Sequence, residues 1–309
     1  MRIAVMGTGA VGGYFGAKLA VAGDDVVFIA RHRHLPALLR DGLRIESPTG
    51  DLHVRNGFFT DSPAAAGTVD LVLFCVKSYD TTEAAMALAP MMTKRTAILS
   101  LQNGIDNPDK IAGHWGSERT LAGVVYIGAQ VSAPGVIQHS SGGKIVLGPI
   151  SGHAADTALI AEQALSRAAI PCVISAVIEQ VQWAKLLWNA SFCAISCLTR
   201  STVGEIVESG ALANLARDCM KEVQAAARTR GIELKTELFD QTLAFSRGLG
   251  DFKPSMLQDL EAGKPLEYDA LNGFVARLLE QAGEQAPINK VFHDTLSFLD
   301  KKLRQEALR

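Results

Sequence analysis

The sequence lacks the features that would mark a metalloprotein or a disulfide-stabilised secreted domain. Its 309 residues include only five cysteines, an odd number, and most of them lie in apolar stretches. No CxxC pair occurs, and no group of cysteines and histidines has the spacing of a zinc site. We therefore expect no bound metal, and we interpret the cysteines as small core residues in a reducing compartment.

A strong charge of one sign and a membrane-spanning run are missing as well. The formal net charge is −2 and the basic residues are scattered, which excludes the electrostatic footprint of a nucleic-acid-binding protein. The longest apolar run, Leu186–Leu198, is interrupted by polar residues and is too short to cross a bilayer. The first apolar stretch has the length of a strand and leads into a glycine turn, unlike a signal peptide. We expect a soluble cytoplasmic protein with no nucleic-acid or membrane partner.

The most informative segment is the first one. An apolar stretch, Arg2–Met6, is typical of a buried strand, and three glycines follow it directly before a helical pattern. This order is the fingerprint of a dinucleotide-binding βαβ unit, in which the glycines allow a tight turn, close backbone approach to a pyrophosphate and close helix packing. An ordinary glycine turn is the alternative, and the flanking strand and helix argue against it. The predicted cofactor-binding residues here are Gly7, Gly9, Ala10, Val11 and Gly12.

The end of the second predicted strand, Val26–Ile29, lacks a carboxylate. In NAD-binding units an acidic residue at this point accepts hydrogen bonds from the ribose. Here the sequence is Ala30-Arg31-His32-Arg33, and an arginine is suited to bind a phosphate bidentately. We therefore predict NADP(H) as the cofactor, with Arg31 as the first candidate to bind its 2′-phosphate. The alternative is that Arg31 and Arg33 are solvated loop residues.

Strands and helices alternate through the first half of the chain, which predicts a parallel sheet covered on both faces. After about residue 175 the strand signals vanish and long helical patterns follow. The sequence thus predicts an α/β Rossmann-type doubly wound domain over residues 1–175 and an all-helical substrate domain over residues 176–309. The predicted strands are Arg2–Met6, Val26–Ile29, a hairpin of Leu43–Ile45 and Leu52–Arg55, Leu71–Val76, Ala97–Leu101, Leu121–Gly128, Val136–His139, Lys144–Leu147 and Cys172–Ile174. The predicted helices include Ala154–Ala169, Glu179–Thr199, Gly204–Arg230, Lys235–Ser246, Pro254–Ala262, Tyr268–Ala282 and Asn289–Ala307.

Two polar side chains follow strands of the predicted sheet. Lys77 comes just after the third main strand, and Asn103 just after the fourth. Because ligands of open α/β sheets bind beyond the carboxyl ends of the strands, both are candidates to contact cofactor or substrate. A cleft between two domains is also the usual place for a substrate. The alternative for Asn103 is plain turn chemistry, since Asn-Gly is a common turn dipeptide.

A lysine lies in very apolar surroundings in the helical half. Lys185, Asn189 and Cys193 are spaced by four residues, which predicts one helical face. A partly desolvated lysine has a lowered pKa and can act as an acid or base near neutral pH. A snorkelling lysine beside a core asparagine explains the same pattern. Further along, Ser255 with Gln258 predicts a capping box, and Glu267 precedes another helix, where a carboxylate favours the helix dipole.

Taken together, these segments resemble the ketopantoate reductase (2-dehydropantoate 2-reductase) family over nearly the whole chain. The resemblance implies NADPH-dependent reduction of ketopantoate to pantoate, a step toward pantothenate and coenzyme A. It also implies a Rossmann domain, a helical domain and an active site between them. The segments that carry it are Gly7–Gly12 with Arg31, Val76-Lys77, Gln102-Asn103-Gly104, Trp183-Ala-Lys185 with Asn189, and Ser255–Asp259 followed by Glu267 and Asn272-Gly273.

The resemblance also implies roles for single residues. Lys185 matches the lysine that protonates the carbonyl oxygen, and Glu267 matches the glutamate that orients this lysine and the substrate hydroxyl. Lys77 matches a lysine on the cofactor side. Substrate-binding positions are matched by Asn103, Asn189 and Ser255, with Ser255 near the carboxylate.

One position departs from the family. The family often has a second substrate-facing asparagine where this chain has Cys193, and a thiol cannot reproduce the hydrogen bonds of an amide. A related 2-oxo acid is therefore a possible substrate in place of ketopantoate. The same pattern of residues is compatible with a 3-hydroxy acid dehydrogenase of similar plan and with a non-catalytic NADPH-binding sensor. The helical half is apolar enough to host a homodimer interface, although it must also cover its own core, so the oligomeric state stays open.

Overall fold

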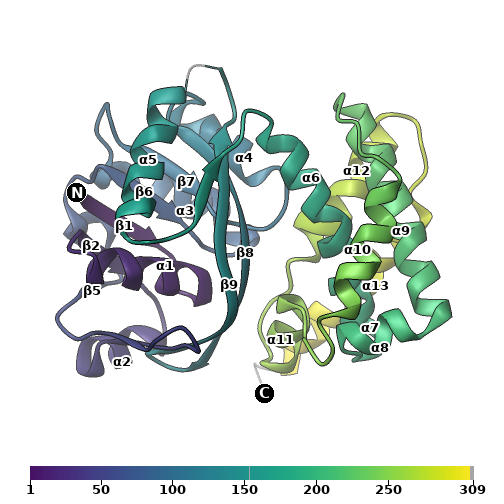
Figure 1. The fold of residues 1–309 in the computed structure, drawn as a ribbon, viewed down its shortest axis with the longest axis horizontal. Coiled ribbons are helices and arrows are strands. Elements are labelled where there is room, and N and C mark those ends of the chain that lie inside the picture. The colour runs from purple at the N-terminus through teal and green to yellow at the C-terminus, as the bar shows by residue number, and fades with distance from the viewer. Residues whose placement is uncertain (153, 307–309) are drawn as a thin grey trace. The chain divides into compact units, whose positions relative to one another are not determined.

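The computed structural model describes residues 1–152 and 154–306 (Figure 1). They form two compact units. The first comprises Met1–Gln102 and Asn107–Ile178, and the second comprises Asn103–Asp106 and Glu179 onward. The domain boundary predicted near residue 175 stays a prediction. Among the described residues, no helix is both long enough and apolar enough to cross a membrane.

The first unit is built on one ten-stranded sheet of order β4-β3-β9-β8-β7-β6-β1-β2-β5, with β10 pairing β9 off this path. Its strands from β8 to β5 are all parallel, and their order is that of a Rossmann domain. The strands are β1 (Arg2–Met6), β2 (Asp25–Ile29), β3 (Leu43–Glu46), β4 (Leu52–Val54), β5 (Phe58–Thr60), β6 (Leu71–Phe74), β7 (Ala97–Ser100), β8 (Thr120–Ala133), β9 (Val136–Pro149) and β10 (Cys172–Ile174).

Both faces of the parallel strands are buried, as the unbroken apolar runs predict. Ile3 and Val5 belong to the core that packs with α1 and α5, whereas the alternating residues Ala4 and Met6 belong to the core that includes residues of α3 and α4. The predicted doubly wound α/β class is therefore confirmed. The helices of this unit are α1 (Ala10–Val21), α2 (His34–Asp41), α3 (Thr81–Ala87), α4 (Asn107–Trp115) and α5 (Ala155–Arg167), with short 3₁₀ turns at Pro63–Ala66, Ser78–Asp80 and Ala89–Met91.

The strands outside the Rossmann order correct the sequence interpretation in two places. Val136–His139 and Lys144–Leu147 were predicted as separate strands, but both lie in β9, which forms a long antiparallel hairpin with β8. Register shifts absorb the glycines that suggested a break. The sequence interpretation also missed β5, a parallel edge strand of only three residues beside β2. The predicted hairpin of β3 and β4 is confirmed.

The second unit is helical, and its core combines residues from all its long helices. Trp183 and Phe192 are among its largest fully buried side chains. The predicted all-helical C-terminal half is thus confirmed. Its helices are α6 (Ile178–Trp188), α7 (Ala194–Thr199), α8 (Val203–Glu208), α9 (Gly210–Thr229), α10 (Glu237–Arg247), α11 (Ser255–Glu261), α12 (Phe274–Gln281) and α13 (Pro287–Glu306).

Three of the predicted helices are not single regular α-helices. The helix predicted over Glu179–Thr199 contains a π-helical turn, Asn189–Cys193, between α6 and α7, and a second π-helical turn, Asp269–Gly273, precedes α12. The helix predicted over Gly204–Arg230 is broken at Ser209, whose side chain accepts a hydrogen bond from Leu212 N at 3.4 Å and caps α9. The single-helix prediction was wrong there, because the apolar period continues across the cap.

Candidate functional site

The glycine loop between β1 and α1 leaves no room for side chains at two of its positions. Gly7 has φ +98°, and a Cβ there would lie 2.8 Å from Val76 N. A Cβ at Gly12 would lie 2.2 Å from Gly7 O and 2.9 Å from Val5 Cγ1. Gly7 therefore permits the turn and Gly12 permits α1 to pack on the strands, as the fingerprint requires.

Gly9 differs from its neighbours, because a Cβ built on it would meet nothing within 4 Å. It is exposed and is the N-cap of α1, with no side chain capping the helix. The first intrahelical bond is donated by Gly13 N to Gly9 O, so the N–H groups of Ala10 and Val11 precede the hydrogen-bonded ladder. Open space over unpaired N–H groups at a helix N-terminus fits the pyrophosphate of a dinucleotide.

Arg31 follows β2 at the edge of this loop region. Its side chain is 43% exposed, and its Nη1 lies 3.6 Å from Oε1 of Glu83, a carboxylate that is itself 75% exposed. A pairing this open and this long contributes little to stability, so it leaves the guanidinium available to an anion. The adjacent His32 has φ +53°, which turns the chain sharply between β2 and α2.

Lys77 is partly buried at the end of β6, in extended backbone just before the 3₁₀ turn Ser78–Asp80. Gln102 holds the backbone on either side of Lys77, because its Nε2 donates to Val76 O at 3.0 Å and to Thr81 Oγ1 at 2.7 Å. Gln102 Oε1 in turn accepts from Ser100 Oγ at 3.0 Å. Gln102 thus ties the ends of β6 and β7 together, a structural role that its position in the sequence did not reveal.

Lys185 and Asn189 meet at one atom in the second unit. Lys185 Nζ donates to Asn103 Oδ1 at 3.0 Å, and Asn189 Nδ2 donates to the same oxygen at 3.3 Å. Asn103 belongs to this unit together with Ile105, which is buried in the helical core. The structure therefore brings together three of the residues that the sequence singled out, and two of them come from one helix.

The environment of Lys185 lowers its pKa. Burial disfavours the ammonium form and brings the pKa from its ordinary value to about 8, while Cys193 and then Glu267 partly oppose this shift. Glu267 and Cys193 are themselves buried, at 7% and 2% exposed. A lysine that titrates near neutral pH beside a carboxylate is equipped to hold and release a proton.

Ser255 does not form the predicted capping box. Pro254 is the N-cap of α11, with no side-chain cap, and Ser255 is the first helical residue and exposed. The extended conformation of Pro254 places the helix start one residue earlier than a Ser255 cap would need, and Gln258 Nε2 donates to Lys253 O instead. A reciprocal capping box does occur at Thr202 and Glu205, where the sequence interpretation did not predict one.

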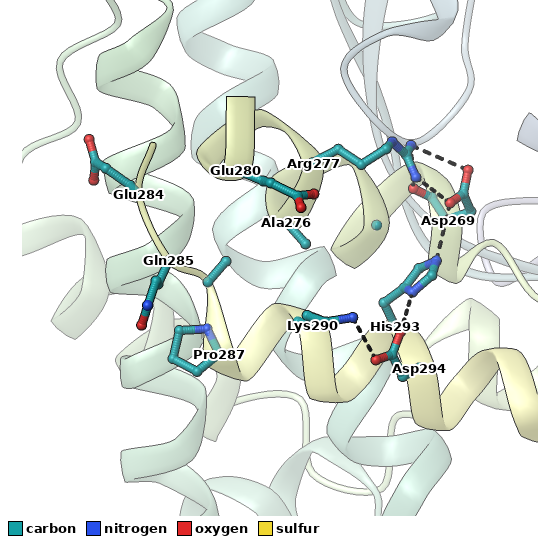
Figure 2. Close-up of a pocket in the computed structure, with 12 residues that line it drawn as sticks. Asp269, Ala276, Arg277, Glu280, Glu284, Gln285, Pro287, Lys290, His293 and Asp294 are labelled. Atoms are coloured by element: carbon teal, nitrogen blue, oxygen red, sulfur yellow. Dashed lines mark hydrogen bonds and ion pairs between the residues drawn. The ribbon is translucent and has the colours of Figure 1, made fainter. Parts of the chain in front are cut away.

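A pocket of about 630 Å³, lined mainly by residues with charged or polar side chains, lies on the second unit between the π-helical turn Asp269–Gly273, α12 and α13 (Figure 2). Arg277 and His293 both reach Asp269, and Lys290 reaches Asp294. The residues that line it do not include Lys185, Asn189 or Glu267. No motif in the sequence indicated this pocket, although all of its lining residues lie between positions 269 and 294.

Two models of one protein family match most of the chain. The model of the N-terminal domain of "Ketopantoate reductase PanE/ApbA" matches residues 3–152, and that of the C-terminal domain matches residues 177–300. The chain belongs to the ketopantoate reductase family. The resemblance inferred from the motifs is therefore confirmed, and the chain is an oxidoreductase of this family.

Relatives of this ketopantoate reductase family member extend over almost its full length. It is 32% identical over 306 residues to a 2-dehydropantoate 2-reductase of Mesorhizobium japonicum, covering 90% of this chain and 91% of the relative. A solved PanE/ApbA family ketopantoate reductase of Ralstonia eutropha JMP134 is 34% identical with a TM-score of 0.90, covering 98% and 100% of the two chains. A D-mandelate dehydrogenase matches with a TM-score of 0.92 at 20% identity, covering 98% and 100%, which is a likeness of fold alone.

Proposed function

We propose that this protein reduces ketopantoate to pantoate with NADPH. The observation that carries the proposal is the cluster of Lys185, Asn189 and Asn103 in a chain of the ketopantoate reductase family. The 2-dehydropantoate 2-reductase of Mesorhizobium japonicum, similar over 90% of this chain, supports the substrate. A D-mandelate dehydrogenase with a similar fold was solved with NADH, so the choice between NADPH and NADH needs its own argument.

The cofactor would be held by the first unit. Its pyrophosphate would lie on the N-terminus of α1, over Gly9, Ala10 and Val11, with Gly7 and Gly12 shaping the loop. Arg31 would bind the 2′-phosphate, because β2 is followed by Ala30 and Arg31 rather than a carboxylate. Lys77 and Asn103 are proposed as further cofactor contacts. When bound, NADPH supplies the hydride that reduces the carbonyl carbon.

Lys185 would act as the general acid. A carbonyl that accepts a hydride becomes an alkoxide, and an adjacent ammonium group both stabilises that charge and supplies the proton. Asn103 Oδ1, which accepts from Lys185 Nζ and from Asn189 Nδ2, fixes the direction of the ammonium group. The buried carboxyl group of Glu267 favours the charged form of Lys185 and would orient the substrate hydroxyl.

The substrate would be bound by Asn103, Asn189 and Ser255, with Cys193 beside them. Cys193 favours a second candidate substrate, a 2-oxo acid with an apolar side chain, because a buried thiol forms only weak hydrogen bonds with a hydroxyl group. The reaction is the same for both substrates, since Lys185 serves the carbonyl group that they share. Only the contacts to the rest of the molecule differ.

The test is NADPH oxidation, followed by absorbance, with ketopantoate and a panel of 2-oxo acids that lack its hydroxyl group. Preferred turnover of ketopantoate with NADPH supports the proposal, with NADH as the matched control for the cofactor. Turnover of another 2-oxo acid alone would keep the chemistry and replace the substrate. Cofactor binding without turnover of any acid would favour a non-catalytic NADPH-binding protein.

A further inference from the structure

Two π-helical turns lie at the candidate site. Asn189–Cys193 contains two residues of the site, and Asp269–Gly273 begins two residues after Glu267. A π-helical turn is rare and widens the helix locally, and such turns are frequent at functional sites. Each widened turn changes the direction of the side chains that follow it. Contacts with the surrounding residues must therefore fix the position of the turn.

One buried hydrogen bond joins the two turns. Asn272 Nδ2, in the second turn, donates to Ala190 O in the first turn at 2.9 Å. The same amide nitrogen donates to Asn289 Oδ1 at 2.9 Å, so both of its hydrogens are used. The side chains of Asn272, Ala190 and Asn289 are 0% exposed. This contact is therefore inside the helical core, at the residue that follows Asn189.

The remaining polar atom of Asn272 is not paired. Its Oδ1 is buried and accepts no hydrogen bond from the described residues. A buried acceptor without a partner lowers stability, and this offsets part of what the two donated hydrogen bonds contribute. The clearest role of the Asn272 amide is therefore to hold the two groups that its nitrogen contacts.

The outer side of the second turn is held by ion pairs. A Cβ at Gly273 would lie 2.6 Å from Asp269 Oδ1 and 2.7 Å from His293 Cδ2, so a glycine lets these side chains close over the turn. Arg277 and His293 both reach Asp269 there (Figure 2). These ion pairs therefore fix the turn that carries Asn272, and the hydrogen bond from Asn272 fixes Ala190 relative to this turn.

We propose that Asn272 is a positioning residue, which holds the π-helical turn Asn189–Cys193 through Ala190 O and so fixes the direction of the Asn189 amide. The proposal rests on the proposed function only for its kinetic consequence. Lys185 lies in α6, before the turn, and keeps Asn103 as its own partner. Loss of Asn272 should therefore disturb substrate binding through Asn189, while Lys185 keeps its hydrogen bond to Asn103.

The test uses Asn272→Leu, which keeps the branching and size of the side chain and removes its donor. The matched control is Gln224→Met, because Gln224 Nε2 also donates from a buried side chain to a backbone oxygen, Leu234 O at 2.6 Å, in the same unit. Asn272→Ser serves if the leucine variant is insoluble. Each is measured for the KM of ketopantoate, the KM of NADPH and the melting temperature.

We expect Asn272→Leu to raise the KM of ketopantoate by about tenfold and to leave the KM of NADPH unchanged. Gln224→Met should change neither KM value. In the double variant with Asn189→Ala, the two effects should not add, because Asn272 acts through Asn189. Equal KM values for Asn272→Leu and the control, or effects that add fully, would overturn the proposal.

Backbone amide exchange separates this proposal from the proposed function. If the wild-type protein turns over no 2-oxo acid, the proposed function is wrong, but Asn272 can still be tested. Asn272→Leu should then speed exchange in residues 189–193, and Gln224→Met should not. Unchanged exchange in that segment would show that Asn272 does not hold the turn.

Discussion

Lys185 Nζ and Asn103 Oδ1 are 3.0 Å apart, although 82 positions separate the two residues in the chain. The link joins α6 to the short segment Asn103–Asp106, which clusters with the helical unit. Asn103 Oδ1 also accepts from Asn189, so one amide oxygen orients two donors that could face a substrate. This shared acceptor gives the candidate site its geometry, and its parts can be tested one at a time.

Replacing the lysine should abolish the chemistry without affecting the cofactor. We expect Lys185→Met to lower kcat by roughly 10²–10⁴-fold, the usual contribution of a general acid. The affinity for NADPH, measured by its fluorescence on titration, should not change. Lys301→Met is the control, because Lys301 is exposed on α13. A variant at Lys185 that keeps wild-type kcat would remove this residue from the mechanism.

The rate of reduction should fall in alkaline solution. Burial lowers the pKa of Lys185 to about 8, and the ammonium form is the one that donates the proton. Above pH 8 we therefore expect kcat/KM to fall about tenfold per pH unit, whereas oxidation of the alcohol, which needs neutral lysine, should rise through the same pH. In Lys185→Arg, whose side chain stays charged, the alkaline fall should vanish even though the rate is lower. A fall that persists in this variant must come from another group.

Selectivity for NADPH should depend on Arg31. Losing a charged hydrogen bond to the 2′-phosphate corresponds to about 10- to 100-fold in affinity, so Arg31→Ala should raise the KM of NADPH by that factor. The KM of NADH should change little, because NADH has no 2′-phosphate. Arg40→Ala is the matched control, since Arg40 is exposed and already paired with Asp41. Equal losses for both cofactors would point to a structural effect.

Alanine substitutions at two glycines of the loop should have different effects, one on NADPH binding and the other on stability. Gly9→Ala adds a methyl group in open space, so the protein should keep its melting temperature and bind NADPH more weakly. Gly12→Ala places the methyl group 2.2 Å from Gly7 O, and such overpacking costs about 1–3 kcal/mol of stability. Thermal unfolding with and without NADPH measures both effects. If Gly9→Ala binds NADPH normally, the pyrophosphate lies elsewhere.

The thiol at position 193 should influence which acid is preferred. Cys193→Asn adds an amide that can bind a hydroxyl group, worth about 0.5–1.5 kcal/mol, or roughly two- to tenfold in KM. We expect the KM of ketopantoate to fall relative to that of 2-oxo acids without a hydroxyl group. Cys193→Ala, which adds no donor, is the control. The same ratio of KM values in all three proteins would place Cys193 outside the substrate site.

Local sequence was enough to predict the Rossmann unit, because its signals lie close together in the chain. Arg2–Met6, the three glycines and the helix after them are consecutive, and each has a direct physical reason for its residue type. The strand β5 was missed because Phe58–Thr60 is too short to show a period. The change to an all-helical half was also visible, because the strand signals end there.

Features that depend on distant contacts or on one extra residue per turn could not be predicted. Lys185 and Asn189 fit an α-helical period, and the π-helical turn that begins at Asn189 leaves that spacing intact. Nothing near Asn103 indicated that its side chain would join α6, since the contact spans 82 positions. The buried bond from Asn272 to Ala190 O is equally long-range, so it emerged only from the packed structure.

The pairing of β3 with β9 has a consequence for synthesis on the ribosome. Arg44 lies opposite Val136, so more than ninety further residues must be synthesised before β9 is available to pair with β3. Until then its free edge can pair with another chain, because an unpaired strand is a template for aggregation. A nascent or truncated chain that ends before residue 136 would carry the complete glycine loop and still lack the strand that closes its sheet. The glycine loop is therefore complete in the nascent chain long before β9 can join β3 to the rest of the sheet.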